Sequence, residues 1–193
     1  MEMLSPGALL IKDPIRPLKR VEYERLAADG FFADEKVELL FGMVVEMPPI
    51  DQAHVESTYR VRRAIERGVG ERARAYSQDP FAASEISEPQ PDVLVVPNVD
   101  NWKHHPTSAY LVVEVARSSL DRDQGAKALL YGMAEVEEYW IVNHQDEVVE
   151  VYRDRRDGLW HSKTIHGRGE RIAMLRFPDV EIIVDEILPP SGG

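Results

Sequence analysis

The stretch LVVEVARSSLDRDQGAKALLYGMAEVEEYWIV, residues 111–142, decides the fold. Its first six residues are apolar except for Glu114, and such continuous apolarity is typical of a central strand covered on both faces. Ser119 or Asp121 can then cap a helix. We expect four apolar residues at helical spacing to pack this helix on the sheet: Ala126, Leu129, Leu130 and Met133. A second strand follows at residues 137–143, and two strands joined by a helix predict an α/β (α+β) domain with a mixed sheet.

The remaining elements extend this sheet outward. Residues 37–46 form two apolar segments around Phe41-Gly42, which is a hairpin pattern. Asp51 can cap a helix that runs to about Arg67, and another strand occupies residues 92–96. Alternating residues at 147–165 and 179–188 predict antiparallel edge hairpins. We expect an extended N-terminal arm at residues 1–20, broken by prolines, and a single domain at residues 21–193 whose mixed β-sheet is flanked by helices.

Composition limits the chemistry. The chain of 193 residues has no cysteine, which excludes thiolate zinc sites and cysteine nucleophiles, so any metal must bind oxygen or imidazole. A formal net charge of -11 disfavours generic attraction to nucleic acid. No apolar stretch approaches the roughly 20 residues that span a bilayer, and we expect a cytoplasmic protein without a membrane partner. Four histidines lack the spacing of zinc motifs and are expected to be solvated: His104, His105, His161 and His166.

Two carboxylates, Asp92 and Glu114, stand inside apolar strand segments. A buried carboxylate is costly unless it is paired, hydrogen-bonded or bound to a cation. One divalent cation shared between adjacent strands would satisfy both, and oxygen ligands are those that Mg²⁺ prefers. Taken singly, Asp92 could be a solvated residue at the start of a strand and Glu114 could pair with a neighbouring basic side chain.

Lys127 shares a helical face with Gln124 and Tyr131. On one interpretation Lys127 pairs with Asp123 on the solvent side. On the other it points toward the two carboxylates, where a cation could orient water or stabilise phosphate charge. Spacing alone leaves both open.

The ordered motifs resemble a known family. QPDVLVV at residues 90–96 and the segment at residues 111–142 are similar to the core of the Uma-type restriction-endonuclease-like proteins of the PD-(D/E)XK nuclease superfamily. The similarity extends upstream to VELLFGMVVEM at 37–47 and HVESTYRV at 54–61, and covers roughly residues 21–153. It implies a restriction-endonuclease-like fold.

The resemblance also implies a catalytic site. Asp92 and Glu114 would bind Mg²⁺, with Mn²⁺ able to substitute and the carbonyl of Val115 as a further ligand, for phosphodiester hydrolysis. The superfamily pattern places lysine two residues after the second acid, but that position is Ala116 here, and Lys127 is the natural replacement. The resemblance suggests further site residues: Glu38, His54, Gln90 and Tyr131.

The leading functional hypothesis is a Mg²⁺-dependent DNA endonuclease in which Arg60, Arg63 and Arg67 contact the DNA backbone. These arginines could instead form a solvated helix face with ion pairs such as Arg67 with Glu71. The alternative function is an inert nuclease-fold module that binds a protein partner. We also expect a homo-oligomer, most simply a twofold dimer, because duplex cleavage needs two active sites and because the apolar tail at residues 180–188 needs cover.

Overall fold

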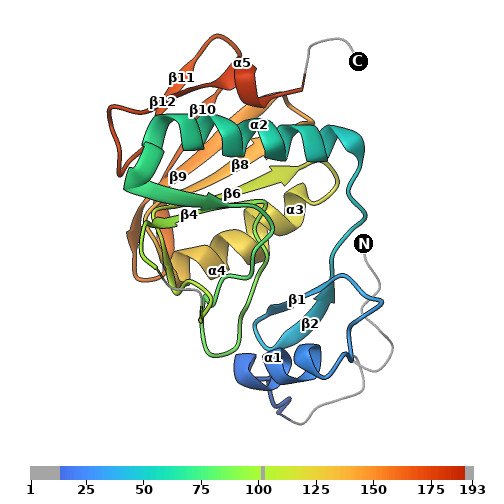
Figure 1. Cartoon of the computed structure of the whole chain (residues 1–193). Helices are drawn as coiled ribbons and strands as arrows, with labels where there is room; N and C mark the ends of the chain where they lie inside the picture. Colours follow the sequence, from blue (N-terminus) through green and yellow to red (C-terminus); the bar gives the residue numbers. More distant parts are fainter. Residues whose placement is uncertain (1–13, 101–102, 190–193) are drawn as a thin grey trace.

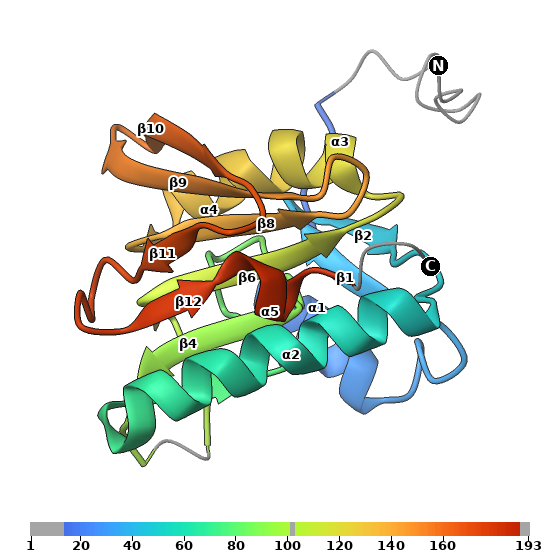
Figure 2. The same ribbon diagram turned by 90° about the horizontal axis from the view of Figure 1, so that it is seen from above.

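The computed structural model describes residues 14–100 and 103–189. Its centre is a six-stranded sheet in the order β10-β9-β8-β6-β4-β3, with β6 in the interior as predicted (Figures 1 and 2). Strands β6 and β8 are parallel and the other pairs are antiparallel, so the sheet is mixed. The strands are β3 (Ala73–Tyr76), β4 (Val93–Pro97), β6 (Leu111–Ala116), β8 (Tyr139–Asn143), β9 (Val148–Arg156) and β10 (Leu159–His166).

Helices cover both faces of this sheet. On one face lie α2 (Gln52–Val69), the hairpin β11 (Arg171–Ala173) with β12 (Glu181–Ile183), and α5 (Val184–Ile187). On the other lie α3 (Leu120–Arg122), the π-helix η2 (Asp123–Lys127) and α4 (Ala128–Met133). Residues of β6 alternate between the two cores: Val113 and Val115 join the first, whereas Val112 and Ala116 join the second. Because side chains alternate along a strand, Glu114 belongs to the face of η2 and α4.

Helix α2 has the predicted N-cap. The side chain of Asp51 accepts a hydrogen bond from the backbone N–H of His54 at 2.9 Å. The apolar face of α2 packs Val61, Ile65 and Val69 into the first core. The helix stops at Gly70, whose φ of 54° suits glycine, and the single turn η1 (Gly70–Arg72) leads into β3.

A small lobe precedes α2. It consists of α1 (Arg20–Ala28) and the hairpin of β1 (Val37–Leu40) with β2 (Met43–Glu46). The hairpin turns at Phe41 and Gly42, as predicted, and both have positive φ, which matches the twist of a tight hairpin. Leu39 and Glu88 exchange backbone hydrogen bonds of 3.3 and 2.8 Å, which tie the lobe to the main sheet.

The N-terminal segment fits the prediction as far as it is described. Residues 14–19 contain no helix or strand, whereas residues 1–13 of the predicted arm lie outside the described residues. Helix α1 begins at Arg20, the last residue of the predicted arm. The division into an arm and a single domain stays a prediction.

The prediction for the helix after β6 was wrong in detail. Leu129 and Met133 are 43% and 63% exposed, whereas Ala128, Leu130 and Tyr131 are buried. The cause is η2, because a π-turn holds more residues than an α-turn and shifts the phase of every later side chain.

The tail also differs from expectation. Val180, Ile182, Val184, Ile187 and Leu188 are buried in the same core as α2. The chain therefore supplies the cover that the apolar tail was expected to find in a partner.

Two short strands, β5 (Ser108–Ala109) and β7 (Glu135–Val136), pair in parallel beside the sheet. Within the described ranges, no helix has the length and apolarity that crossing a membrane requires.

Candidate active site

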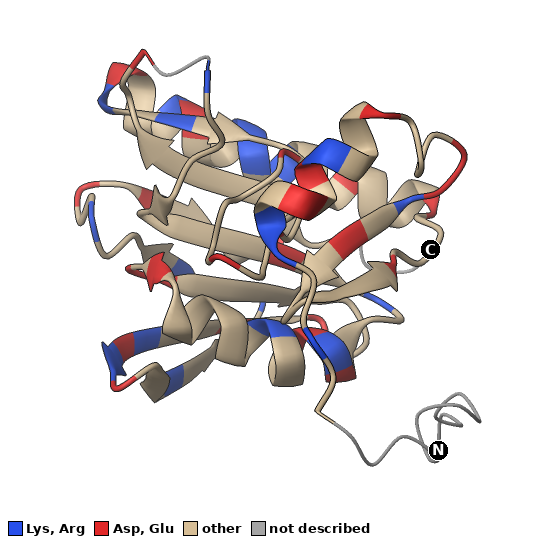
Figure 3. Ribbon diagram, turned by 90° about the horizontal axis from the view of Figure 1, so that it is seen from below, with Lys and Arg blue, Asp and Glu red and all other residues tan. Residues whose placement is uncertain are grey.

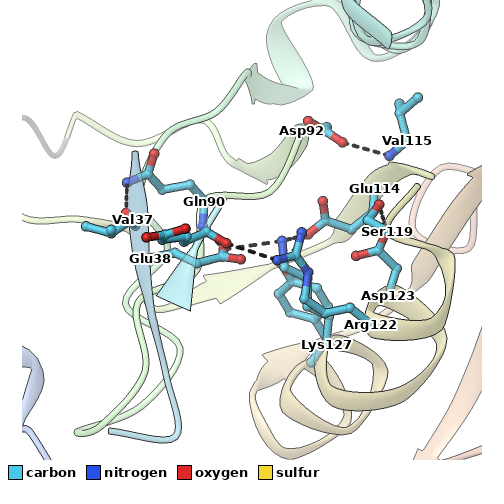
Figure 4. A network of polar contacts seen from close by, with 12 residues as sticks. Val37, Glu38, Gln90, Asp92, Glu114, Val115, Ser119, Arg122, Asp123 and Lys127 are labelled. Atoms are coloured by element: carbon cyan, nitrogen blue, oxygen red, sulfur yellow. Dashed lines mark hydrogen bonds and ion pairs between the residues drawn. The ribbon is translucent and has the colours of Figure 1, made fainter. Parts of the chain in front are cut away.

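A pocket opens where the start of β4 and the end of β6 meet the first turn of α2. The helical segment α3–η2–α4, which connects β6 to β8 and is called the crossover helix below, forms another wall, and β1 closes the pocket from the small lobe (Figure 4). Its cavity volume is about 60 Å³. Seven of its polar lining residues matter below: Glu38, His54, Asp92, Glu114, Arg122, Asp123 and Lys127. All seven come from segments singled out in the sequence, so the fold brings distant motifs to one place.

Asp92 lies immediately before β4 and is 7% exposed. Its Oδ2 accepts a hydrogen bond from the backbone N–H of Val115 at 2.7 Å, which fixes it beside the strand that carries Glu114. Its Oδ1 lies 2.8 Å from Nε2 of His54. Burial lowers the pKa of His54, but the hydrogen bond and negative charge of Asp92 outweigh burial and raise that pKa above its ordinary value. His54 therefore positions Asp92 from the start of α2.

Glu114 is 3% exposed and is held through one oxygen. Its Oε1 accepts hydrogen bonds from Lys127 Nζ at 2.9 Å and from the Tyr131 hydroxyl at 2.6 Å. Both bonds use Oε1, so Oε2 has no hydrogen bond from any residue that the structure describes. Burial raises the pKa of Glu114 to about 8, although the charge of Lys127 opposes the shift. The charge of Lys127 alone therefore does not offset the cost of burying the Glu114 carboxylate.

Lys127 points toward the carboxylates, the second of the two orientations that the sequence left open. Its Nζ lies 2.9 Å from Glu114 Oε1 and 3.2 Å from Glu38 Oε2, and the residue is 3% exposed. Burial lowers the pKa of Lys127, but the charges of Glu114, Glu38 and Asp123 outweigh burial and raise it. The ammonium is therefore charged at neutral pH. Gln124, expected on the same face, instead donates to Glu150 at 2.7 Å, away from the pocket.

Glu38 brings the small lobe into the site. It lies on β1 with no exposed surface, and its Oε2 accepts a hydrogen bond from the backbone N–H of Gln90 at 3.1 Å. The side chain of Gln90 donates to the carbonyl of Val37 at 3.4 Å. Oε1 of Glu38 is buried without a hydrogen-bond partner among the described residues. A buried carboxylate oxygen without a hydrogen-bond partner costs free energy, unless a cation or a water molecule contacts it.

Asp123 is a pocket residue that the sequence analysis considered only as a solvent-side partner of Lys127, in one of two open interpretations. It is 2% exposed, its Oδ2 accepts from the Ser119 hydroxyl at 2.6 Å, and burial raises its pKa. The π-turn of η2 turns Asp123 and Lys127 inward together. The four-residue spacing of Asp123 and Lys127 was a signal that the two residues share a face, but the spacing did not tell which face.

The donor set fits a hard divalent cation. Besides Asp51, which is paired with Arg117, four carboxylates line the pocket: Glu38, Asp92, Glu114 and Asp123. Lys127 is paired with Glu38 and Glu114, and His54 is paired with Asp92. Oxygen-only ligation with several waters is typical of Mg²⁺. No three side-chain ligand atoms of the pocket come within 4.8 Å of one another in the described residues, so a cation there would rely partly on water and backbone.

Three such atoms do come together elsewhere, at Glu24, Glu88 and His105. His105 is exposed, as predicted, but its Nδ1 lies 3.3 Å from Glu88 Oε2. The guanidinium of Arg20 already pairs with Glu24 and lies 3.9 Å from Glu88. Because Arg20 supplies positive charge to this group, we assign no metal to it.

The three arginines predicted to contact DNA lie along α2, and each has a partner. Arg60 pairs with Glu56 at 2.7 Å, Arg63 donates to the Tyr59 hydroxyl at 2.9 Å, and Arg67 pairs with Glu186 of α5 at 2.9 Å. The expected pair of Arg67 with Glu71 is replaced by the contact with α5. In the ribbon of Figure 3, basic and acidic segments are interspersed along the chain.

With this geometry established, comparisons with known proteins are informative. Residues 20–185 match the model of the Uma2 family, described as "Putative restriction endonuclease". The chain belongs to the Uma2 family. The match begins at the first residue of α1 and ends in α5, so Uma2 membership covers every element described above. A search of the curated proteins found no match.

The Uma2 chain also resembles a solved structure from Anabaena variabilis ATCC 29413, described as "a putative nuclease belonging to DUF820". The TM-score is 0.71 at 13% identity, over 89% of this chain and 97% of the other. At this identity the likeness shows a shared fold. Family and fold together confirm the predicted restriction-endonuclease-like architecture of the PD-(D/E)XK superfamily.

Proposed function

We propose that this chain is a Mg²⁺-dependent DNA endonuclease that hydrolyses phosphodiester bonds. The observation that carries the proposal is the buried ammonium of Lys127, 2.9 Å from Glu114 and 3.2 Å from Glu38, in the pocket that also contains Asp92. Membership of a restriction-endonuclease-type family supports the reaction class.

Asp92, Glu114 and the carbonyl of Val115 would hold the cation, with Glu38 as an additional acid. The structure offers two oxygens for this purpose, the unbonded Oε2 of Glu114 and the orphaned Oε1 of Glu38. Bound Mg²⁺, or Mn²⁺ in its place, would supply Lewis-acid activation of water and would offset phosphate charge.

The side chains of the chain itself have distinct tasks in this proposal. Lys127 is charged and therefore cannot accept a proton from water; its ammonium instead stabilises negative charge that develops on the phosphate. Tyr131 and Lys127 hold one oxygen of Glu114 and leave the other free. Val115 N–H and His54 fix the direction of the Asp92 carboxylate, and Gln90 fixes Glu38 through its backbone N–H.

DNA would approach along α2, whose first turn carries His54. Arg60 and Arg67 pair with carboxylates that are about half exposed, and such exposed pairs contribute little free energy, so phosphates can compete for both guanidinium groups. Arg63 is bound only by a neutral hydroxyl in the described structure. A twofold dimer would present two such helices to one duplex, and cytoplasmic DNA would be the substrate.

Cleavage of supercoiled plasmid DNA tests the proposal. We expect nicking in Mg²⁺ or Mn²⁺ and none in EDTA, with Asp92→Asn and Glu114→Gln each inactive. Asp121→Asn, an exposed carboxylate on the same crossover, is the control and should retain activity. If the wild-type protein binds the cation but never cleaves DNA, the alternative of an inert interaction module is correct.

A further inference from the structure

Arg122 lines the pocket and forms no ion pair among the described residues. Its Nε is buried and has no hydrogen-bond partner, and its only hydrogen bond among described residues runs from Nη1 to the carbonyl of Glu46, at 3.3 Å. No ion pair joins Arg122 to any carboxylate in residues 14–100 or 103–189, although five carboxylates line the same pocket. In Figure 4, Arg122 and Lys127 reach the same region of the pocket from the crossover helix.

A buried guanidinium N–H without a partner costs free energy, and native proteins rarely retain one without a reason. The other arginine of the pocket provides the contrast. Arg117 is more exposed, with 58% of its side chain accessible, and it is paired with Asp51. Arg117 is therefore satisfied by the chain itself, whereas Arg122 has an N–H group available for a ligand.

The backbone around Arg122 is fixed before any ligand arrives. The next residue, Asp123, is anchored twice: its side chain accepts from the Ser119 hydroxyl at 2.6 Å, and its carbonyl accepts from the Tyr139 hydroxyl at 3.0 Å. The carbonyl of Glu46 holds Nη1 from the side of β2. The guanidinium is thus held by one hydrogen bond to β2, on a backbone that Ser119 and Tyr139 anchor at the next residue.

The ligand of such a group is an anion, and a planar guanidinium matches the oxygens of a phosphate. The proposed function favours a phosphodiester over a carboxylate, because the same pocket contains Lys127 and the candidate cation ligands. We infer that Arg122 forms a phosphate-binding subsite, in which its Nε–H donates to a non-bridging oxygen of a nucleic-acid phosphodiester. This inference rests on the proposed function.

Fluorescence anisotropy with a labelled short DNA duplex in Mg²⁺ tests the inference separately from catalysis. We expect Arg122→Ala to weaken duplex binding about 10- to 100-fold, the loss typical of a charge-assisted hydrogen bond. Arg122→Lys should recover only part of the affinity, because an ammonium cannot reproduce the planar fork. Arg156→Ala is the control and should bind within about threefold of wild type, because Arg156 lies on β9 outside the pocket and is paired with Asp154.

Thermal unfolding without DNA separates a binding role from a structural one. Arg122→Met should unfold close to the wild-type temperature, because the loss of the single hydrogen bond to the Glu46 carbonyl is offset by removal of a buried unpartnered N–H. A marked fall in that temperature, or duplex binding by Arg122→Ala equal to that of Arg156→Ala, would overturn the inference. So would a wild-type protein that binds no DNA in Mg²⁺.

The two proposals fail in different ways. If the wild-type protein binds duplex and Arg122→Ala does not, while plasmid DNA stays intact in both Mg²⁺ and Mn²⁺, the subsite stands and the nuclease proposal falls. If plasmid is cleaved but Arg122→Ala cleaves and binds as wild type does, the nuclease proposal stands and the subsite falls.

Discussion

At the scale of single residues, Lys127 links the two parts of the pocket. One ammonium contacts Glu114 on the central strand and Glu38 on the hairpin of the small lobe. Buried charges are tolerated only when they are paired, so this lysine stabilises both carboxylates at once. We propose that this lysine, on the helix after the second acid, replaces the lysine that the superfamily pattern puts on the strand.

Lys127→Ala should lower DNA cleavage by about 10²–10³ in kcat, because the lost ammonium acts chiefly in the transition state. Metal affinity, measured by calorimetric titration with Mn²⁺, should change little. The pattern to look for is thus a fall in kcat without a matching loss of cation binding. Cleavage by Lys127→Ala at the wild-type rate would show that the lysine has only a structural role.

Glu88 gives a residue-scale prediction about pH. Burial, with a smaller contribution from Glu24, raises the pKa of Glu88 from its ordinary value of 4.5 to about 7. Between pH 4.5 and about 7, Glu88 is protonated in the folded protein but has lost its proton in the unfolded chain. The stability that the protonated carboxyl group contributes is therefore fully present below pH 4.5 and is lost as the pH rises through about 7. Glu88→Gln should remove this slope and raise the free energy of unfolding at pH 8 by about 1–3 kcal/mol.

Urea unfolding of Glu88→Gln in EDTA between pH 4.5 and 8 provides the measurement. Glu85→Gln, an exposed neighbour in the same loop, should keep the wild-type slope. Parallel slopes in the wild-type protein and Glu88→Gln would show that Glu88 titrates normally in the fold.

Among the helices and strands, the crossover helix α3–η2–α4 positions several side chains of the pocket. The π-helix η2 turns Asp123 and Lys127 inward, and α4 then supplies Tyr131. Helix α4 is held against the β9–β10 hairpin by a hydrogen bond from Trp160 Nε1 to the Ala128 carbonyl, at 2.8 Å. At Gly132 the two elements approach so closely that a Cβ would lie 2.5 Å from the Gly158 carbonyl oxygen.

Two glycines of this crossover make a matched test. Gly132→Ala should lower the free energy of unfolding by about 1–3 kcal/mol, because the added methyl group meets rigid backbone. Gly125→Ala adds its methyl group where no atom lies within 4 Å and should be neutral or stabilising by up to about 1 kcal/mol. Urea unfolding measures both. Equal stability of the two variants would contradict the close packing of α4 on the hairpin.

The elements also show what the sequence could predict. The central strand, the hairpin at Phe41 and Gly42, and the helix capped by Asp51 were predicted because each carries a local pattern that needs no tertiary information. The exposure of Leu129 and Met133 could not be predicted, because a π-turn breaks the helical period without a sequence signature. The contacts of Lys127 with Glu38 and of His54 with Asp92 depend on tertiary packing, although the family pattern pointed to all four residues.

At the scale of the whole molecule, a chain with net charge -11 must bind a polyanion through local surfaces. The arginines of α2 and the pocket residue Arg122 are the local positive groups that the structure offers for this. Acidic and basic segments otherwise alternate in Figure 3. The buried tail removes one reason for a dimer, whereas the need to cut both strands of a duplex remains.

We therefore still predict a homodimer, of about twice 21.9 kDa. Light scattering coupled to size exclusion at micromolar concentration measures the mass directly. A monomer that nicks single strands independently would contradict the dimer without affecting the site.

The most direct test of the central claim is the anomalous difference density of a crystal soaked in Mn²⁺. We predict one strong peak in the pocket, from an Mn²⁺ ion bound by Asp92, Glu114 and the Val115 carbonyl. This peak should disappear in Asp92→Ala crystals. A well-ordered pocket with no peak, or a peak only at Glu24, Glu88 and His105, would show that the cluster around Lys127 is not a cation-binding active site.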